Sequence, residues 1–242
     1  MYKYSILMPY IKRAGQLHNT LVSFCHYYSH RKDFQVVIIE DHKNFINVTE
    51  HELLSKVIDI FKTKINILHL HDLNVDVYNP APLFNLGAKN SESEFIVLTS
   101  PECFHSVDIL KGFDTEDPST YVLCACQNFK HGKLWINNFS EFTGTTHEWY
   151  QHSKHRNASF HFCSRISRSN WDKIGGFDER FKNGIAYEDD YFRDRVIAAK
   201  ILFIKRDDLF IKHIDHGGFQ KPPNYETLLA KNQSLHIELR II

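Results

Sequence analysis

Three adjacent carboxylates, Glu188, Asp189 and Asp190, follow shortly after the glycine pair Gly175 and Gly176. The glycines predict a tight turn, and the acids open a segment with the apolar spacing of a helix. The unpaired N–H groups and the dipole of a helix N-terminus favour negative charge, so carboxylates placed there stay ionised near neutral pH. Such a carboxylate can act as a general base or bind a cation. For the triplet alone, a helix cap with solvated charges is the structural alternative.

Four other polar clusters each follow an apolar run that predicts a β-strand. They are Pro9 and Tyr10 with Arg13, Glu40 with Asp41, Ser100 and Pro101 with Glu102, and His213 with His216. Ligands bind at the carboxyl ends of the strands in open parallel sheets, so we expect these clusters on one rim. One arginine, several carboxylates and two histidines predict a site for a diphosphate and a cation. Coordination completed by phosphate oxygens suits Mn²⁺ or Mg²⁺ rather than tetrahedral Zn²⁺.

Strands and helices must alternate in the first hundred residues to place these clusters. The apolar pattern predicts strands at 4–8, 34–39, 65–70 and 95–99, and helices at 16–28, 51–62 and 83–89. Continuous β-branched runs between helices indicate strands that are covered on both faces. The fold class is therefore α/β, with a central, mostly parallel sheet flanked by helices and joined by right-handed crossovers.

The second half of the chain is less regular. Residues 128–157 are polar, aromatic and rich in histidine, and they predict a long irregular segment that is functional or mobile. Strands are predicted at 121–126, 160–166, 202–205 and 209–212, and helices at 169–174, 191–200 and in the tail after Pro222. Because the sequence contains no repeat or linker, we expect one domain over 1–242.

The composition narrows the class of protein. The 242 residues carry 29 basic and 29 acidic side chains, which argues against a broad surface for nucleic acid or anionic membrane. The five cysteines are odd in number, and Cys124 and Cys126 lack zinc-ribbon spacing, so reduced thiols in a cytosol-like compartment are expected. No apolar run is long enough for a signal peptide or a membrane span. We expect a cytoplasmic protein of bacterial or viral origin, with peripheral membrane attachment left open.

The order of the motifs resembles GT-A-fold glycosyltransferases, near the family-2 enzymes and the β-1,4-galactosyltransferase-like family. Gly175–Asp178, followed by Glu188–Asp190 and Arg195, resembles their acceptor-and-base segment. Met8–Arg13 resembles their donor-binding turn, and Pro82–Ala88 resembles the Asn-x-Gly helix that leads into their metal motif. The resemblance divides the chain into a nucleotide-sugar-binding half at 1–102, an acceptor and catalytic half at 103–221 and a tail helix at 222–242.

One departure from these families lies at the metal motif. They usually carry Asp-x-Asp where this chain has Ser100-Pro101-Glu102, so Glu102 would be the metal-bridging carboxylate. The sequence is similar to the Asn-Pro-Glu version of some family-2-like transferases. The resemblance therefore implies Mn²⁺ or Mg²⁺ and leaves the strength of metal dependence open.

The resemblance also implies a reaction: a sugar moves from a nucleotide-diphospho-sugar, expected to be a UDP-sugar, to an acceptor hydroxyl with inversion. Asp189 would be the base and Glu188 would hold the acceptor. The other implied acceptor residues are Asp190, Gly176, Trp135 and Trp149. The implied donor residues are Pro9, Tyr10, Arg13, Glu40, Asp41, Asn85, Ser100 and Pro101. Glu102 with His216, or else with His213, would hold the metal, and surface polysaccharide is one expected acceptor class.

Two other functions remain open. A nucleotidyltransferase shares the α/β layer, but it would carry a glycine-rich phosphate loop, and Pro9–Gly15 has a single glycine. A non-catalytic sugar-binding or partner-binding module is suggested by the altered Asp-x-Asp position, since a fold does not imply an activity. The intact acid triplet and the paired histidines argue against that module.

Overall fold

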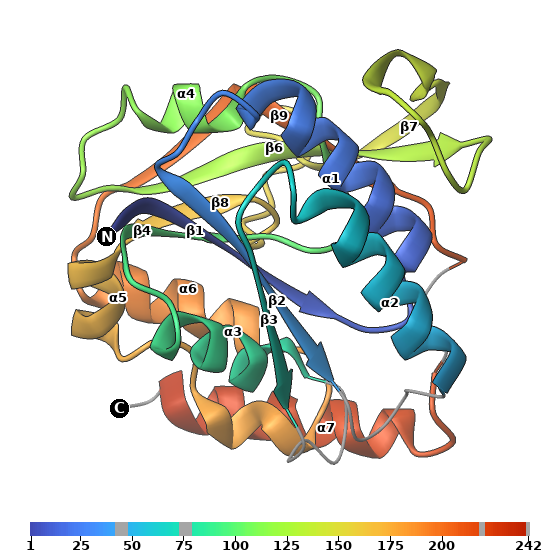
Figure 1. Ribbon diagram of the computed structural model, residues 1–242. Helices are drawn as coiled ribbons and strands as arrows, with labels where there is room; N and C mark the ends of the chain where they lie inside the picture. Colours follow the sequence, from blue (N-terminus) through green and yellow to red (C-terminus); the bar gives the residue numbers. More distant parts are fainter. Residues whose placement is uncertain (42–47, 73–78, 218–220, 241–242) are drawn as a thin grey trace.

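The computed structural model describes residues 1–41, 48–72, 79–217 and 221–240 (Figure 1). The strands are β1 (Tyr2–Tyr10), β2 (Phe34–Asp41), β3 (Ile67–Asp72), β4 (Ser93–Leu98), β5 (Cys103–His105), β6 (Tyr121–His131), β7 (Gly144–Gln151), β8 (Ser164–Ser167) and β9 (Phe203–Ile214). The α-helices are α1 (Ala14–Tyr28), α2 (Val48–Phe61), α3 (Pro80–Lys89), α4 (Ile109–Phe113), α5 (Arg168–Ile174), α6 (Glu188–Ala198) and α7 (Tyr225–Arg240), with 3₁₀ turns η1 (Phe139–Glu141) and η2 (Glu179–Asn183).

One sheet runs through both halves of the chain in the order β3-β2-β1-β4-β8-β6-β9-β5, and β7 pairs with β6. The first four strands are parallel, as predicted. In the second half β6 and β9 are also parallel, while β8, β5 and β7 pair antiparallel with their neighbours. The parallel part therefore brings the carboxyl ends of β1, β2, β3 and β4 to one rim.

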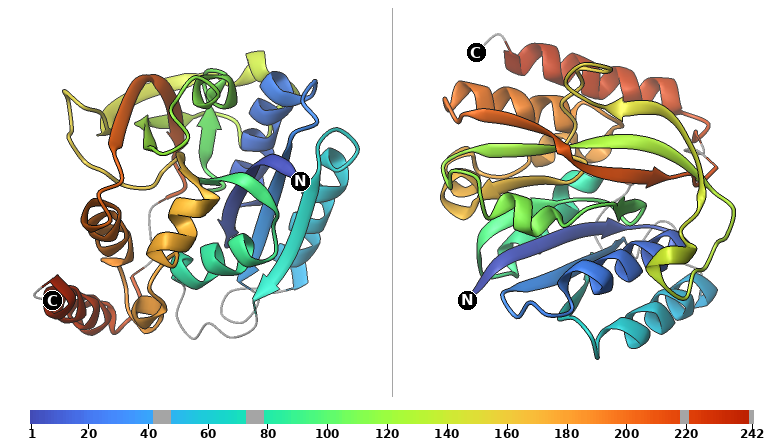
Figure 2. Two further views of the ribbon diagram at one scale, coloured as in Figure 1. Left: turned by 90° about the vertical axis from the view of Figure 1, so that its left-hand side faces the viewer. Right: turned by 90° about the horizontal axis from the view of Figure 1, so that it is seen from above.

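Side chains along β1 alternate between two cores. Ile6 and Met8 pack into the cluster that contains α1 and α2, whereas Leu7 packs into the cluster that contains α3, α5 and α6. Figure 1 shows these two helical layers on opposite sides of the sheet. The tail helix α7 lies beyond α6 and η2, on the outside of the second layer (Figure 2).

The prediction of an irregular 128–157 segment is wrong for 128–131 and for 144–151. Strand β6 continues to His131, and Gly144–Gln151 returns beside it as β7. β7 pairs with β6 alone and most of its side chains are exposed, so it tolerates polar residues, whereas Phe129 of β6 is buried in the core.

Three other predicted boundaries differ from the structure. The strand expected at 160–166 begins at Ser164, because Cys163 takes a φ of 46° that interrupts the extended chain. The two strands expected at 202–205 and 209–212 are one strand, β9. Its register against β6 shifts between Cys124, which pairs with Arg206, and Ala125, which pairs with Phe210. Helix α6 begins at Glu188 rather than 191.

Pro9 was expected to end the first strand, but β1 continues to Tyr10. The last residue of β1 that pairs with β4 is Leu7, so Pro9 pairs with Ile39 of β2 alone. A proline has no N–H to donate, and this position beyond the end of β4 tolerates its absence.

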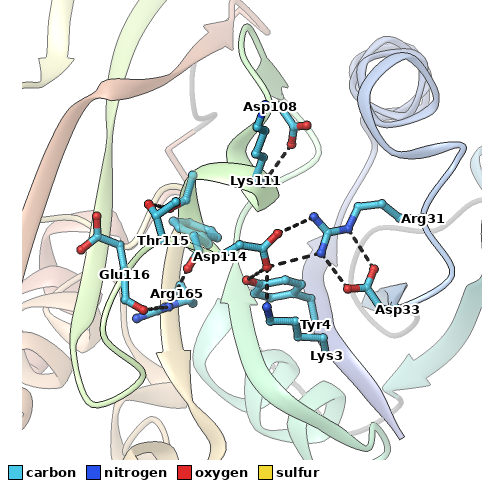
Figure 3. Close-up of polar contacts among 12 residues, drawn as sticks. Lys3, Tyr4, Arg31, Asp33, Asp108, Lys111, Asp114, Thr115, Glu116 and Arg165 are labelled. Carbon is cyan, nitrogen blue, oxygen red and sulfur yellow. Dashed lines mark hydrogen bonds and ion pairs between the residues drawn. The ribbon is translucent and has the colours of Figure 1, made fainter.

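A polar network joins the start of β1 to the turn after α4 (Figure 3). The carboxylate of Asp114 accepts hydrogen bonds from Lys3 over 2.6 Å, from the Tyr4 hydroxyl over 2.8 Å and from Arg31 over 2.8 Å. The buried Arg165 donates to the carbonyl oxygen of Phe113 over 2.9 Å. This network lies at the amino end of β1, away from the rim that carries the polar clusters, and so acts as scaffold.

No helix within the described ranges is both long enough and apolar enough to cross a lipid bilayer.

Candidate active site

Glu102 and two histidines meet at the junction of β4, β5 and β9. The pairing of β5 with β9 sets Cys103 opposite His213, and the N–H of Ile214 donates to the carbonyl oxygen of Glu102 over 2.8 Å. Oε1 of Glu102 then lies 3.8 Å from Nε2 of His213 and 3.9 Å from Nε2 of His216. Strand pairing therefore assembles this group from residues more than a hundred positions apart.

Glu102 carries its charge in a buried position. Its side chain is 9% exposed, and among the described residues its Oε2 has no hydrogen-bond partner. Burial raises the pKa of Glu102, but contact with His213 and the charges of Arg13 and His216 outweigh it and lower the pKa to about 2. The carboxylate is therefore ionised and keeps an oxygen available for a ligand.

These three residues fit a divalent cation. The candidate ligand atoms of Glu102, His213 and His216 all lie within 4.8 Å of one another. Imidazole with carboxylate suits Mn²⁺ and its transition-metal neighbours better than Mg²⁺, which prefers oxygen throughout. The two histidines are equally close to Glu102, so both His213 and His216 fit as ligands of the same ion.

Arg13 reaches the same carboxylate from the turn between β1 and α1. It is the residue before α1, and its Nη1 lies 3.5 Å from Oε1 of Glu102. The preceding residue, Lys12, takes a φ of 44°, so the turn that presents Arg13 is backbone-strained. A guanidinium beside a helix N-terminus favours a bound anion such as a phosphate.

The acid triplet forms the first turn of α6. The two residues before it, Ala186 and Tyr187, take φ values of 60° and 68°, which non-glycine residues rarely adopt. Oε2 of Glu188 accepts from Nδ2 of Asn79 over 3.3 Å, and Oδ1 of Asp189 accepts from the N–H of Asp190 over 2.8 Å. A strained turn thus aims the first two acids, and strain of this kind clusters at functional sites.

The two leading acids have pKa values above the ordinary range. For Glu188, burial is the main cause and the charge of Asp189 adds to it. For Asp189, burial and the charge of Asp190 raise the pKa. Asp190 itself is paired with Arg193 over 2.7 Å. A carboxylate with a raised pKa accepts a proton more readily than an ordinary one, as a general base must.

Tyr150 of β7 lies against the Glu102 group, and sequence reasoning missed it. Its ring stacks on His213 with centroids 5.4 Å apart, and the charge of Asp189 contributes to the raised pKa of its hydroxyl, which burial mainly causes. Tyr150 therefore packs beside one of the candidate metal ligands. The available signal was its place in the aromatic segment 128–157.

The two predicted tryptophans lie in different surroundings. Trp135 packs against His18 of α1 with centroids 4.9 Å apart, whereas Trp149 packs against His152 at 4.4 Å. Within the described ranges no ring contact joins them to each other. The structure therefore does not bring them together as one stacking surface.

Asn85 of α3 packs against the turn at Gly176 and Phe177. A Cβ on Gly176, which has a φ of 64°, would lie 2.6 Å from Oδ1 of Asn85. The amide of Asn85 donates to the carbonyl oxygen of Phe177 and accepts from its N–H, each over 2.9 Å. Both ends of the Asn85 amide are thus used to hold the turn that precedes the acid triplet.

The remaining predicted donor residues line the ends of β1, β2 and β4. Tyr10 and Asp41 are fully buried, and Glu40 is fully buried among three histidines. Ser100 lies 3.0 Å from the thiol of Cys103, and the carbonyl oxygen of Pro101 accepts from Thr20 of α1 over 2.7 Å. Ser100 and Pro101 therefore fix the turn that presents Glu102.

Solved glycosyltransferases share this architecture. The S. aureus TarS 1-349 structure in complex with UDP-GlcNAc superposes with a TM-score of 0.64 at 12% identity, covering 93% of this chain and 64% of that one. A longer S. aureus TarS structure has a TM-score of 0.62 at 14% identity, covering 88% of this chain and 37% of that one. Mannosyltransferase PcManGT from Pyrobaculum calidifontis, in complex with GDP-Man and Mn²⁺, has a TM-score of 0.61 at 10% identity, covering 98% of this chain and 65% of that one.

No protein-family model matches the sequence. No curated protein matches it either. The chain spans between about a third and two thirds of the length of these three transferases. At such identities the likeness concerns architecture: the chain has a GT-A-type glycosyltransferase fold, with a curled, mostly parallel sheet flanked by helices.

Proposed function

We propose that this protein is an inverting glycosyltransferase that moves a sugar from a nucleotide-diphospho-sugar to an acceptor hydroxyl. The observation that carries the proposal is the assembly of Glu102 with His213, His216 and Arg13, together with the buried acid triplet that opens α6. An anion site and a proton acceptor in one place are the two requirements of this reaction. The architecture shared with sugar transferases supports the same conclusion.

In this mechanism Asp189 accepts the proton of the acceptor hydroxyl as that oxygen attacks the anomeric carbon. Glu188, held by Asn79, positions the acceptor by accepting a hydrogen bond from a second hydroxyl. Asp190, paired with Arg193, keeps negative charge beside Asp189 and so favours proton uptake there. Attack from the side opposite the leaving group inverts the anomeric configuration.

On the donor side Arg13 binds the diphosphate, and Tyr10 and Asp41 border the nucleoside with the turn at Ser100 and Pro101. Glu102, His213 and His216 would hold Mn²⁺ or a similar divalent cation, which supplies positive charge for the leaving nucleoside diphosphate when bound. The donor is proposed to be a UDP-sugar, in line with the UDP-GlcNAc in TarS. The acceptor class proposed is a glycan hydroxyl, as in polysaccharide synthesis.

A panel of nucleotide-sugars tests this function. Thermal stabilisation and hydrolysis are measured for each UDP-, GDP-, dTDP- and CMP-sugar, with and without Mn²⁺. We expect one UDP-sugar to raise the melting temperature in a Mn²⁺-dependent way and to be hydrolysed slowly. Binding without hydrolysis or transfer would favour a non-catalytic module, and no binding by any donor would overturn the proposal.

A further inference from the structure

A second group of histidines converges on one carboxylate at the edge of the sheet. This group, the Glu40 cluster, consists of Glu40 at the end of β2, His69 and His71 of β3, and His51 of α2. Nδ1 of His51 lies 3.1 Å from Oε1 of Glu40. Nε2 of His69 and Nδ1 of His71 lie 2.9 Å and 3.0 Å from its Oε2.

The strand register explains the assembly. Glu40 pairs with His71 across β2 and β3, and His69 lies two residues before His71, so both histidines share one face of β3. Ile38 precedes Glu40 on that same face and belongs to the same core cluster as Leu54 of α2. His51 lies three residues before Leu54, about one helical turn away, and this spacing brings it over the carboxylate.

The solvent exposure of the cluster is graded. The side chain of Glu40 is fully buried, while those of His69, His51 and His71 are 20%, 39% and 43% exposed. One charged, hydrogen-bonded partner would offset the free-energy cost of burying the Glu40 carboxylate. Three imidazoles on the same carboxylate exceed that need, and the exposed side offers a path for a small ligand.

The spacing of the polar atoms suits a metal ion. The candidate ligand atoms of Glu40, His51 and His71 all lie within 4.8 Å of one another. In a tetrahedral zinc site with bonds of about 2.0 Å, neighbouring ligand atoms lie roughly 3.3 Å apart. Nδ1 of His51 lies 3.1 Å from Oε1 of Glu40 and Nδ1 of His71 lies 3.0 Å from its Oε2, so each imidazole is close to that spacing from one carboxylate oxygen.

We propose that the Glu40 cluster is a second metal site, which binds Zn²⁺ or a closely similar transition-metal ion through Glu40, His51 and His71. His69 donates a hydrogen bond to the carboxylate and orients it, as such partners of metal ligands do. Two imidazoles and a carboxylate select transition metals over Mg²⁺ and Ca²⁺. The site goes beyond the proposed transfer reaction and does not depend on it.

A metal here would join β2, β3 and α2 at the rim. Tyr10 of β1 pairs with Glu40, and Glu40 pairs with His71, so the three side chains form a row across one face of the sheet. The row borders the side of the rim proposed to receive the nucleoside. The metal would therefore stabilise this edge of the sheet by binding the folded state and not the unfolded chain.

Zn²⁺ binding by the full-length protein tests the proposal. Equilibrium dialysis without nucleotide, followed by elemental analysis, gives the amount of Zn²⁺ bound, and the visible absorption of bound Co²⁺ reports tetrahedral coordination. The double variant His51→Gln/His71→Gln removes two ligands of the Glu40 cluster. The double variant Glu102→Gln/His216→Gln removes two from the other group, and His30→Gln alters an exposed histidine as a control.

We expect the His51→Gln/His71→Gln protein to lose one equivalent of Zn²⁺ and the Co²⁺ absorption of that site. The Glu102→Gln/His216→Gln and His30→Gln proteins should keep both signals. His69→Gln should keep the equivalent but weaken its affinity by roughly 10–100-fold. Circular dichroism in chelator checks that each variant folds, and the exposure of His51 and His71 makes their substitution mild.

The proposal is overturned if wild-type protein binds no Zn²⁺ without nucleotide, or if His51→Gln/His71→Gln binds it as wild type does. Donor binding is measured separately on the same preparations. A protein that binds a nucleotide-sugar and no Zn²⁺ contradicts the second site alone. A protein that binds Zn²⁺ at the Glu40 cluster and no nucleotide-sugar contradicts the transferase function alone.

Discussion

Nδ2 of Asn232 donates a hydrogen bond to the carbonyl oxygen of Ala186 over 2.8 Å and another to that of Phe181 over 3.1 Å. Asn232 is fully buried although it belongs to the tail helix α7. Its two bonds hold the chain on both sides of Gly184, immediately before the strained turn that begins α6. The tail helix therefore supports the backbone that aims Glu188 and Asp189.

Replacing Asn232 with alanine should release this turn. Loss of the buried amide removes the Asn232 donor from the carbonyl oxygen of Ala186, while that of Phe181 keeps hydrogen bonds from Asn79 and Gly184. An unsatisfied buried carbonyl oxygen costs about 1–3 kcal/mol of unfolding free energy. We expect a melting temperature lower by several degrees, and a larger loss of transfer rate than of donor affinity, because the turn positions the proposed base. Lys231→Ala, an exposed neighbour, is the control. Equal behaviour of the two variants would show that α7 does not support the turn.

The charge of Asp189 is the basis of the proposed proton transfer. Asp189→Asn keeps the size of the side chain but cannot accept a proton, so transfer should fall by about 10²-fold or more. Donor affinity, measured by calorimetry, should stay close to wild type, and Asp172→Asn at an exposed position of α5 should leave both unchanged. A matching loss of donor affinity would assign Asp189 to donor or metal binding instead.

The raised pKa of Asp189 sets the direction of the pH dependence. A base works when it is deprotonated, so kcat should rise with pH through the raised pKa of this carboxyl, above the ordinary value of 3.8. Burial and the charge of Asp190 both shift this limb toward neutral pH. The pH profile of kcat tests this expectation, and Asp190→Asn should move the limb to lower pH. A profile that is flat across the acid range would contradict the assignment.

Ionisation of Glu188 should lower the free energy of unfolding as the pH rises. Its pKa is higher in the folded protein than the ordinary 4.5, because of burial and the charge of Asp189. Above pH 4.5 the Glu188 carboxyl therefore stays protonated in the folded state to a greater extent than in the unfolded state. The contribution of Glu188 to the free energy of unfolding falls as the pH rises toward its pKa in the folded protein. In Glu188→Gln, which can still accept from Asn79, this loss should be smaller. Urea unfolding at pH 4.5 and pH 8 measures the difference, and an unchanged difference would contradict the raised pKa.

Glu102 should govern metal-dependent donor binding. In Glu102→Gln the side chain keeps its shape but loses the charge facing His213, His216 and Arg13. We expect the Mn²⁺-dependent part of donor affinity to weaken by roughly tenfold or more, while Glu92→Gln at an exposed position has no effect. Titration of the donor with and without Mn²⁺ measures this. Equal Mn²⁺ enhancement in Glu102→Gln and wild type would exclude Glu102 as a ligand.

The sequence alone determined the α/β class, the positions and parallel pairing of the first four strands, and the candidate residues around Glu102, Arg13 and the acid triplet. These could be predicted because buried strands and amphipathic helices have local apolar periods, and because parallel strands bring their carboxyl ends to one rim. The predicted link of Glu102 with His216, or else with His213, also needed only the expectation that two strands end on the same side.

Tertiary structure decided the parts that depend on pairing between distant segments. β7 and the extension of β6 bury few apolar side chains, Phe129 among them, so they show no regular apolar alternation that would predict strands. The roles of Tyr150 and Asn232 depend on contacts with His213 and Ala186, more than forty residues away in each case. The Glu40 cluster likewise arises from the register of β2 against β3 and from α2 above them. Local sequence encodes periodicity, whereas these contacts follow from strand register and helix packing across the whole chain.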